Sequence, residues 1–390
     1  MTTKKSRTLV LVGLEGEDEL IRAVQSQAQA FLTVTELPQT ASTSDIAAAA
    51  AVRLPDGTEL DRAHVVGVLL NANPCASGDV DTAALRLENA LELAKAIREA
   101  CPHAFVMLWH RDAVEDPRLR IAAFASGANM VTCFAEHAAE AVQKLASIGA
   151  VDNGPRQCSC DWCGQTGMTA DELWLHQPLY HIYEANRSGR CCACACGPDG
   201  AAGGGPEVDN LAVHIHEAHR PAAHGGPYTE LRRGLGSAVV VHRRSDNKFL
   251  MVQEFAAQGF WVPGGGTDVG ETLRASAVRE CEEEAGVQVA LQGLADIAHL
   301  LDSDGKPCWR LATFYAVLSD PANEAAARPK TVPCFESAGA CWVSADQLDA
   351  IPLRSERIPK TWFPHFARGG AALPLQLPAD QAHLFPDVGF

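Results

Sequence analysis

The chain has 390 residues, of which 47% are hydrophobic and 21% are charged, and its formal net charge is −16 at pH 7. This length predicts two or three domains, and the apolar content is enough for a sizeable core in each. The acidic balance excludes a protein that holds nucleic acid without regard to base sequence, because such binding depends on many lysine and arginine contacts to phosphates.

No apolar run approaches the length of a membrane-spanning helix. The first residues, "MTTKKSRTLVLVG", enter an apolar run almost at once, which leaves no room for a cleavable signal or a transit peptide. We therefore expect a cytoplasmic or nuclear protein. Of the 14 cysteines, half lie within residues 158–196, beside histidines. Such clustering is typical of metal binding in a reducing compartment rather than of a secreted disulfide scaffold.

The first block, residues 7–148, alternates strand-like and helix-like stretches. Three unbroken apolar runs are typical of buried parallel strands: 8–13, 64–70 and 104–109. Helical patterns occupy 83–100 and 117–127. Repeated strand–helix units predict a doubly wound parallel sheet. The low-complexity stretch 41–57 is expected to form a surface excursion.

The order of strands and helices in this block, with "VVGVLLNANP" and a later "ASGAN", resembles the receiver domain of response regulators. The resemblance implies that the phospho-acceptor position is Asn71, whose amide cannot form an acyl phosphate. Three further positions of the family pattern also differ: its acidic pair falls at Gly13 and Leu14, its small hydroxyl residue at Trp109 and its lysine near Cys133. We predict a degenerate receiver that serves as a docking domain. A generic flavodoxin-like fold without signalling ancestry is the alternative.

The second block, residues 157–220, holds a Cys-x2-Cys-x12-His-x4-His pattern that resembles a Cys2His2 zinc finger. Its four predicted ligands are Cys160, Cys163, His176 and His181. Leu173 stands three residues before the first histidine, where such fingers keep a core leucine. Thiolates and imidazoles at this spacing can close a tetrahedral Zn²⁺ site.

A looser second set follows in the same block. Its predicted ligands are Cys191, Cys194, His214 and His219, and the glycine-rich loop 197–209 lies between the cysteine pair and the histidine pair. Leu211 again precedes the first histidine by three residues. Three residues remain rival ligands: Cys192, Cys196 and His216. Free thiols and ordinary surface histidines are the alternative for both sets, and Cys158 is expected to be a spare thiol.

The composition of this block argues against direct reading of DNA. Residues 151–230 contain four arginines, no lysine and ten acidic residues, and the helix of the first finger would open with Asp171 and Glu172. A finger that reads DNA needs basic residues on and around its helix. We predict structural zinc in a small module that binds a protein partner, with the metal supplying folding energy.

The third block, about 228–370, begins with a strand–turn–strand pattern over 237–254, and its turn is expected near Asn247. Further on, "GGGTDVGETLRASAVRECEEEAGV" begins at Gly264. Within it Leu273, Ala277, Cys281 and Ala285 recur every fourth residue, which predicts a helix with one apolar face.

Acidic residues crowd the end of this helix. Glu280, Glu283 and Glu284 stand at i, i+3 and i+4, so they share a second face. Three converging carboxylates are unfavourable without a cation, and Mg²⁺ accepts such oxygen ligands together with substrate phosphates. A solvated acidic helix face is the alternative for the same residues considered alone.

The spacing around these glutamates resembles the Nudix box at every defined position. The pattern reads Gly265, five residues, Glu271, seven residues, Arg279-Glu280, Cys281, Glu282, Glu283-Glu284, Ala285, Gly286, Val287. The resemblance covers about 230–368 and implies an α/β/α sandwich with a mixed sheet. It also implies hydrolysis of a nucleoside diphosphate linked to another moiety, by attack of water with Mg²⁺ or Mn²⁺ as cofactor.

Roles follow from the resemblance residue by residue. Glu280, Glu283 and Glu284 match the metal ligands, and Glu283 or Glu284 also acts as the base for the attacking water; the sequence does not choose between them. Glu271 and Arg279 match the acidic residue at the helix start and the arginine that orients the carboxylates. Gly264, Gly265 and Gly266 form the expected substrate loop.

The substrate is left open by the sequence. The stretch that follows the box in NADH-cleaving relatives is missing from 288–310, and Leu301-Asp302 stand where many ADP-ribose hydrolases keep a proline. Five basic residues before the box could contact extra phosphates or simply be solvated: Arg232, Arg233, Arg243, Arg244 and Lys248. Trp261 is expected in the core rather than against a base.

Taken together, the sequence predicts a multidomain α/β and α+β protein. Its parts are a receiver-like domain (7–148), a tandem zinc module (157–220), a Nudix hydrolase domain (228–370) and a peripheral tail (371–390). A signalling or scaffold protein whose Nudix domain only binds a nucleotide is the first alternative. A hydrolase of capped RNA or of an inositol pyrophosphate is the second.

Overall fold

The structure, a computed structural model, describes twelve stretches of the chain. They are 7–14, 16–28, 32–37, 65–73, 80–100, 102–148, 158–195, 205–224, 226–227, 234–301, 303–305 and 307–375. The predicted excursion at 41–57, most of the tail, Arg232, Arg233 and Cys196 lie outside these residues. Among the described residues, no helix combines the length and the apolarity that crossing a membrane requires.

The chain divides into two compact units. Unit 1 contains Met1–Val114, Arg118–Pro227 and Thr331–Cys334. Unit 2 contains Glu115–Pro117, Tyr228–Lys330 and Phe335–Phe390. The receiver-like and cysteine-rich blocks therefore fall in the same unit.

Unit 1 contains a five-stranded sheet in which every pair of neighbouring strands is parallel. The strands are β1 (Arg7–Val12), β2 (Leu32–Leu37), β3 (Val65–Asn71), β4 (Phe105–Trp109) and β5 (Met130–Thr132), in the order β2-β1-β3-β4-β5. This order is that of flavodoxin-like doubly wound folds. The predicted parallel sheet is thus present.

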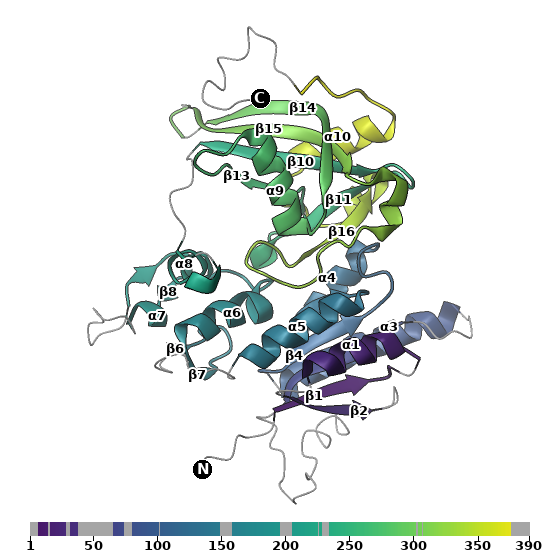
Figure 1. Cartoon of the computed structure of the whole chain (residues 1–390), viewed down its shortest axis with the longest axis vertical. Coiled ribbons are helices and arrows are strands. Elements are labelled where there is room, and N and C mark those ends of the chain that lie inside the picture. The colour runs from purple at the N-terminus through teal and green to yellow at the C-terminus, as the bar shows by residue number, and fades with distance from the viewer. Residues whose placement is uncertain are drawn as a thin grey trace, which may run out of the picture. The chain divides into compact units, whose positions relative to one another are not determined.

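Four described helices accompany these strands: α1 (Asp18–Ala28), α3 (Val80–Ala100) and α4 (Pro117–Ala125) lie between successive strands, and α5 (Ala135–Ser147) follows β5. Helices α1 and α5 lie side by side and share one buried core with β1 and β4 (Figure 1). Each places small or branched apolar residues toward the sheet, such as Val24 from α1 and Val142 from α5.

The cysteine-rich part of unit 1 consists of two short hairpin–helix modules. The first has β6 (Cys158–Ser159), β7 (Thr166–Met168) and α6 (Ala170–His181). The second has β8 (Gly189–Arg190), α7 (Cys192–Ala195), β9 (Glu207–Val208) and α8 (Leu211–Ala218), followed by the short turn η2 (Ala222–His224). Helix α6 begins with a capping box in which Thr169 and Glu172 each accept the other's backbone N–H.

Helix α6 also packs on the core of the five-stranded sheet. Leu179 is buried in that core, and the Tyr180 ring meets the Phe105 ring edge-on at 5.5 Å between centroids. The amide of Asn129 donates a hydrogen bond of 2.8 Å to the carbonyl of Tyr180. The first hairpin–helix module therefore packs against the sheet through buried apolar side chains, in addition to being covalently connected to it.

Unit 2 contains a seven-stranded mixed sheet. Its strands are β10 (Leu235–Arg243), β11 (Lys248–Gln253), β12 (Phe260–Trp261), β13 (Gly264–Gly266), β14 (Val289–Leu301), β15 (Pro307–Leu318) and β16 (Gly339–Ser344). The main order is β12-β11-β10-β15-β14, while β13 pairs with β10 and β16 pairs with β11. Strands β10 and β15 are parallel and the other pairs are antiparallel, as a mixed sheet requires.

Helix α9 (Leu273–Ala285) packs across this sheet (Figure 1). Its predicted apolar face is buried, from Leu273 to Ala285, against Val239, Phe314 and Trp342. The remaining elements of unit 2 are α10 (Arg357–Ala367) and three short 3-10 turns, η3 (Phe255–Ala257), η4 (Pro321–Ala326) and η5 (Ala345–Ala350). Burying one face leaves the other residues of α9 free to build a site.

Some predicted elements need correction. Strand β2 is one of them: its sequence "LTVTEL" alternates polar and apolar residues and lacks the continuous apolar run that predicts a buried strand. As an edge strand paired only with β1 it needs less apolar cover. The segment 319–330 contains the 3-10 turn η4. The β10–β11 turn lies where it was predicted, and Asn247 there has φ of 59°.

Candidate active site and metal centres

Helix α9 begins and ends with local signals that fix its register. The side chain of Thr272 accepts the Ala275 N–H at 3.1 Å at the start of the helix. Gly286 ends it in the left-handed conformation, with φ of 68°, and its N–H is bonded to the carbonyls of Cys281 and Glu282. With both ends defined, the glutamates near the end of α9 occupy determined positions relative to strand β13.

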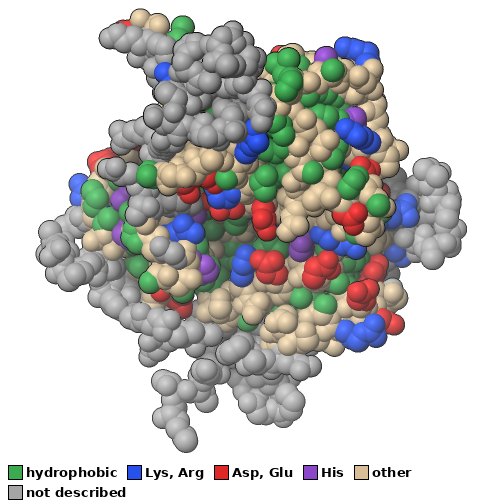
Figure 2. Space-filling model, turned by 45° about the horizontal axis from the view of Figure 1, so that its top comes forward, with side chains coloured by type: hydrophobic (Ala, Val, Ile, Leu, Met, Phe, Trp, Pro, Cys, Tyr) green, Lys and Arg blue, Asp and Glu red, His purple; other side chains and the backbone are tan. Residues whose placement is uncertain are grey.

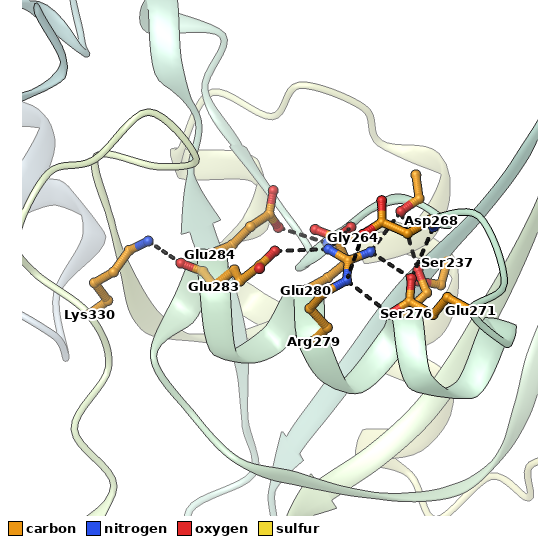
Figure 3. A network of polar contacts seen from close by, with 11 residues as sticks. Ser237, Gly264, Asp268, Glu271, Ser276, Arg279, Glu280, Glu283, Glu284 and Lys330 are labelled. Atoms are coloured by element: carbon orange, nitrogen blue, oxygen red, sulfur yellow. Dashed lines mark hydrogen bonds and ion pairs between the residues drawn. The ribbon is translucent and has the colours of Figure 1, made fainter. Parts of the chain in front are cut away.

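Glu280 and Glu284 project from α9 toward the glycine strand β13 (Figure 3). Both residues are buried. A carboxylate oxygen of Glu284 accepts the N–H of Gly264 at 2.8 Å. A Cβ atom on Gly265 would lie only 2.6 Å from Oε1 of Glu280. A side chain at position 265 would therefore displace the Glu280 carboxylate, which lies directly against that backbone.

Arg279 joins three carboxylates and the glycine strand (Figure 3). Its guanidinium holds Glu271 through two bonds of 2.9 Å, and it reaches Glu280 at 2.9 Å and Glu283 at 2.8 Å. It also donates to the carbonyl of Gly266 at 2.9 Å. This planar fork fits the predicted role of an arginine that orients the carboxylates.

Burial raises the pKa of Glu280 to about 7, and the attraction of Arg279 does not offset it. Burial also raises the pKa of Glu284 well above its usual range, and the nearby charges of Glu254 and Glu280 add to the effect. Two buried carboxylates are stable together only with a proton or a cation between them. A set of hard oxygen donors of this kind suits Mg²⁺ or Mn²⁺.

The structure only partly gathers the three predicted metal ligands. Glu283 is half-exposed and is turned toward Arg279, whereas Glu280 and Glu284 are buried. Among the described residues, only the two Cys/His sets place the ligand atoms of three or more histidine, cysteine, aspartate or glutamate side chains within 4.8 Å of one another. Repulsion between neighbouring carboxylates favours the separate pairing of Glu283 with arginine. Glu282 is exposed.

Several residues that position the site could not be found from the motif. Ser237 on β10 and Ser276 on α9 share a buried hydrogen bond of 2.9 Å. The hydroxyl of Ser337 donates to the carbonyl of Glu284 at 2.6 Å, and the ammonium of Lys330 donates to the carbonyl of Glu283. These partners lie about 40 to 50 positions from the residues they contact, so no local sequence pattern predicts them.

The described basic residues before the box are held in contacts with other side chains of the protein. Arg243 is buried and pairs with Asp246 at 2.7 Å, and Lys248 and Arg243 both reach Glu115 at 2.7 Å. Arg244 contacts the hydroxyl of Tyr315. These contacts favour a structural role for these three residues over the suggested phosphate contact.

Trp261 is only partly in the core. The Arg354 guanidinium lies 5.1 Å from its ring centroid, within the range of a cation–π contact.

The first Cys/His set is assembled as its spacing predicts. The Sγ of Cys163 lies 3.5 Å from Nε2 of His176, and that nitrogen lies 3.2 Å from Nε2 of His181. Neighbouring ligand atoms around tetrahedral Zn²⁺ should lie roughly 3.3–3.7 Å apart, given bonds of about 2.0 Å to nitrogen and 2.3 Å to sulfur. Hydrogen bonding from Cys160 lowers the pKa of Cys163, which favours the thiolate.

His181 is oriented by a neighbour. Its other ring nitrogen, Nδ1, lies 2.8 Å from Oε1 of Glu184, one turn further along the chain. A carboxylate in this position fixes the ring so that Nε2 faces the centre of the set. Leu173 is buried beneath the set, as predicted.

The second set has the same character. Nε2 of His219 lies 3.3 Å from Sγ of Cys191 and 3.2 Å from Sγ of Cys194, and Nε2 of His214 lies 3.2 Å from the latter. Leu211 is buried beneath it.

Two of the three rival ligands, Cys192 and His216, are placed outside the second set, and Cys196 lies outside the described residues. The thiol of Cys192 lies 3.3 Å from the carbonyl of Ser159, and the His216 ring stacks on Trp174. Cys158, expected to be a spare thiol, is buried. The four side chains that the structure gathers in the second set are therefore the four predicted ones.

Surface charge does not favour a nucleic-acid interface. Basic and acidic side chains are interspersed on the described part of the face shown in Figure 2, with no continuous basic patch there. Asp171 and Glu172 open helix α6, as expected. Neither finding supports DNA binding through the zinc module.

The position predicted for a phospho-acceptor is filled by a structural amide. Asn71 ends β3, its Nδ2 donates to the carbonyl of Gly13 at 2.8 Å, and its Oδ1 accepts the N–H of Asn73 at 3.0 Å. Trp109 is buried at the end of the neighbouring strand β4. Both hydrogen-bonding groups of the Asn71 amide thus serve the local backbone.

Comparison with known proteins concerns unit 2. The family model described as the NUDIX domain matches residues 233–366, so this segment is a Nudix domain, as the box predicted. The Uncharacterized Nudix hydrolase YvcI of Bacillus subtilis (strain 168) is 34% identical over 77 residues. Those residues are 19% of this chain and 48% of that protein, so the match spans about half of the relative's length.

Solved structures are also similar to this part of the chain. A NUDIX hydrolase from Nitrosomonas europaea is 20% identical with a TM-score of 0.30, and the match covers 38% of this chain and 98% of that one. An ADP-ribose pyrophosphatase from Streptococcus suis is 25% identical with a TM-score of 0.25, and that match covers 34% of this chain and 86% of the other.

Proposed function

We propose that the Nudix domain at residues 233–366 hydrolyses a diphosphate linkage in a nucleoside diphosphate joined to another group, with Mg²⁺ or Mn²⁺ as cofactor. The observation that carries this proposal is the burial of Glu280 and Glu284 against the glycine strand Gly264–Gly266. Buried carboxylates that repel one another weaken the fold unless a cation is bound. Their position against backbone without side chains leaves room for phosphate oxygens beside that cation.

The chain's own residues divide the chemical work. Glu280, Glu283 and Glu284 would hold the cation, which when bound would polarise the phosphoryl oxygens and offset the negative charge that develops on them. Arg279 and Glu271 position Glu280 and Glu283 through the bonds already described.

Glu284 is the better candidate for the base. A general base must retain the proton that it accepts, and burial raises the pKa of Glu284 above that of an exposed carboxylate. Glu283 is half-exposed and ion-paired with Arg279, which favours a permanently charged ligand. Glu284 therefore accepts the proton of the attacking water, and Glu283 contributes charge and position.

Unit 1 has a different part in this proposal. The two Cys/His sets each hold a structural Zn²⁺ in this proposal, because the four candidate ligand atoms of each set lie within 4.8 Å of one another. The receiver-like domain does not accept a phosphoryl group, since Asn71 holds the acceptor position. It binds a protein partner through a surface that does not switch.

The test is a Mg²⁺-dependent screen of the full chain against nucleoside diphosphate derivatives, with ADP-ribose, capped RNA and inositol pyrophosphates in the same panel. Hydrolysis in H₂¹⁸O then shows which phosphorus the water attacks. Glu284→Gln should lower kcat on the best substrate by roughly 10²–10⁴-fold, the range of a lost general base. Glu282→Gln is the matched control, because Glu282 is an exposed neighbour outside the cluster.

Two outcomes decide between the alternatives. Binding of a nucleotide without release of product over the whole panel would replace the hydrolase by a nucleotide-binding scaffold. Equal losses for Glu282→Gln and Glu284→Gln would refute the assignment of roles within the helix.

A further inference from the structure

Two described cysteines of residues 157–220 lie outside both Cys/His sets. Cys158 belongs to strand β6 of the first hairpin–helix module, and Cys192 begins helix α7 of the second. Neither side chain is among the four that each set gathers. Cys158 is 1% exposed, whereas Cys192 is partly exposed. One of the two thiols is therefore accessible to solvent, and the other is covered by the protein.

The thiols of these two cysteines meet. The Cys192 thiol is in hydrogen-bond contact with the Cys158 thiol, and its Sγ lies 3.3 Å from the carbonyl oxygen of Ser159, the residue after Cys158. Helix α7 thus packs directly on strand β6. A disulfide needs two cysteine Cβ atoms about 3.5–4.5 Å apart, so two thiols already in contact require only a small movement to become bonded.

The two modules share one apolar core, which holds the thiols together. That core contains Leu173 from the first module and Leu211 and Ile215 from the second. The indole Nε1 of Trp174 on α6 also donates a hydrogen bond of 3.0 Å to the carbonyl of His216 on α8. The contact between the two thiols is therefore a property of the packed modules and not of a surface loop.

We propose that Cys158 and Cys192 form a redox pair, which hydrogen peroxide converts to a disulfide that joins the two modules. The accessible Cys192 sulfur attacks one peroxide oxygen, the O–O bond breaks, and a sulfenic acid and one water are formed. The Cys158 sulfur then attacks the Cys192 sulfur, the S–O bond breaks, and the hydroxyl group leaves as a second water with the proton of Cys158. The two thiols lose two electrons in total, and these reduce the peroxide to water.

The disulfide strengthens the first Cys/His set. It closes a loop of chain, residues 158–192, that contains all four ligands of this set: Cys160, Cys163, His176 and His181. A closed loop has fewer open conformations, so the module opens less often and releases a bound metal more slowly. The inference goes beyond the proposed hydrolysis. Its effect on metal release rests on the proposed zinc, whereas formation of the disulfide does not.

The experiment uses the full chain with its zinc retained, reduced and then freed of reductant by gel filtration. Hydrogen peroxide is added stepwise, and thiol content, released zinc and the disulfides of a non-reduced digest are measured. We expect the Cys158–Cys192 disulfide, with loss of two thiols, before any zinc is released. Cys192→Ser should not form it. Cys334→Ser, which removes a partly exposed cysteine outside residues 157–220, should form it as the wild type does.

A second measurement follows zinc transfer to EDTA. Transfer from the first set should be roughly tenfold slower in the oxidised chain than in the reduced chain, because of the closed loop. Since Cys158 is buried, Cys158→Ala, which keeps a small apolar side chain, should hold its zinc when reduced and form no disulfide at Cys192. Equal zinc transfer from the oxidised and reduced chains would contradict the proposal.

Three other results would overturn the redox pair. The first is a disulfide within the ligand pairs of the Cys/His sets, with release of zinc, as the earliest product of oxidation. The second is an unchanged loss of thiols in Cys192→Ser. The third is a lower zinc content of reduced Cys192→Ser or Cys158→Ala, which would make the replaced cysteine a metal ligand. If the chain contains no zinc and still forms the Cys158–Cys192 disulfide, the proposed zinc sites fail and the redox pair stands.

Discussion

Replacing Arg279 by glutamine tests how far the stability of α9 and the rate of hydrolysis depend on the arginine that positions the carboxylates. The substitution removes both bonds to Glu271 and the bond to the buried Glu280. The bond to Glu283 counts for little, because that carboxylate is 48% exposed and screened by water. Leaving a buried carboxylate without its cationic partner costs about 3–5 kcal/mol, and protonation of Glu280 recovers part of that. We expect a net loss near 3 kcal/mol when Mg²⁺ is absent.

A chain of two units need not unfold in one transition, so the measurement should be local. Hydrogen exchange of the α9 peptide, followed by mass spectrometry, should be roughly 150-fold faster in Arg279→Gln, the equivalent of 3 kcal/mol. The value of kcat should fall by at least about 100-fold, since a small misplacement of the reacting groups has that effect. Arg274→Gln is the matched control, because Arg274 lies on the same helix and, within the described part of the chain, donates its hydrogen bond to the carbonyl of Leu375 and not to a carboxylate.

A double-mutant cycle with Glu271→Gln sharpens this test. The two side chains form a bidentate pair, so their coupling energy should be about 1–3 kcal/mol. Wild-type exchange and kcat in Arg279→Gln, or strictly additive effects in the cycle, would refute the reasoning that this guanidinium holds the site together.

Three further predictions concern zinc, pH and the receiver-like domain. Purified protein should contain about one to two Zn²⁺ per chain by metal analysis. The variant Cys163→Ser should lose one of these ions and loosen α6, while diphosphate hydrolysis persists. Native protein without zinc would contradict this prediction. Without Mg²⁺, the free energy of unfolding should fall by up to roughly 3 kcal/mol as pH rises from 4.5 to about 7, because the folded chain keeps a proton on Glu280 that the unfolded chain releases. In a pH series of melting curves, Glu280→Gln should flatten this slope. Acetyl phosphate with Mg²⁺ should not phosphorylate the chain or its Asn71→Asp variant in a mass-spectrometric assay, since Gly13 and Leu14 replace the acidic pair; phosphate on the new aspartate would show that the pocket still works.

Local patterns in the sequence were sufficient for helix α9 and for the two Cys/His sets. The buried face from Leu273 to Ala285 repeats every fourth residue, and helix geometry alone turns that spacing into one surface. The ligand pairs of the zinc sets lie on short hairpins and single helices, so their spacing already limits how the four atoms can meet. The box likewise contains both Gly265 and Glu280, whose contact follows from the packing of α9 on β13.

Contacts between distant segments were decided only by the tertiary structure. The motif predicts that Glu280, Glu283 and Glu284 converge, but packing buries two of them and leaves Glu283 with Arg279. It contains no sign of Ser337, whose hydroxyl reaches the end of α9 from 53 positions away. The sequence does not predict strand β2, because an edge strand needs no continuous apolar run.

The same division explains Glu254. Its sequence neighbourhood, "VQEFAAQG", shows one acidic residue at the end of a strand, which is most often a solvated position. The pairing of β11 with β16 and the bond from Ala338 to Gln253 bury it beside Glu284. Spacing along a helix determines which residues share a face, whereas strand pairing over 80 or more residues determines which carboxylates meet, and that pairing depends on the whole packed sheet.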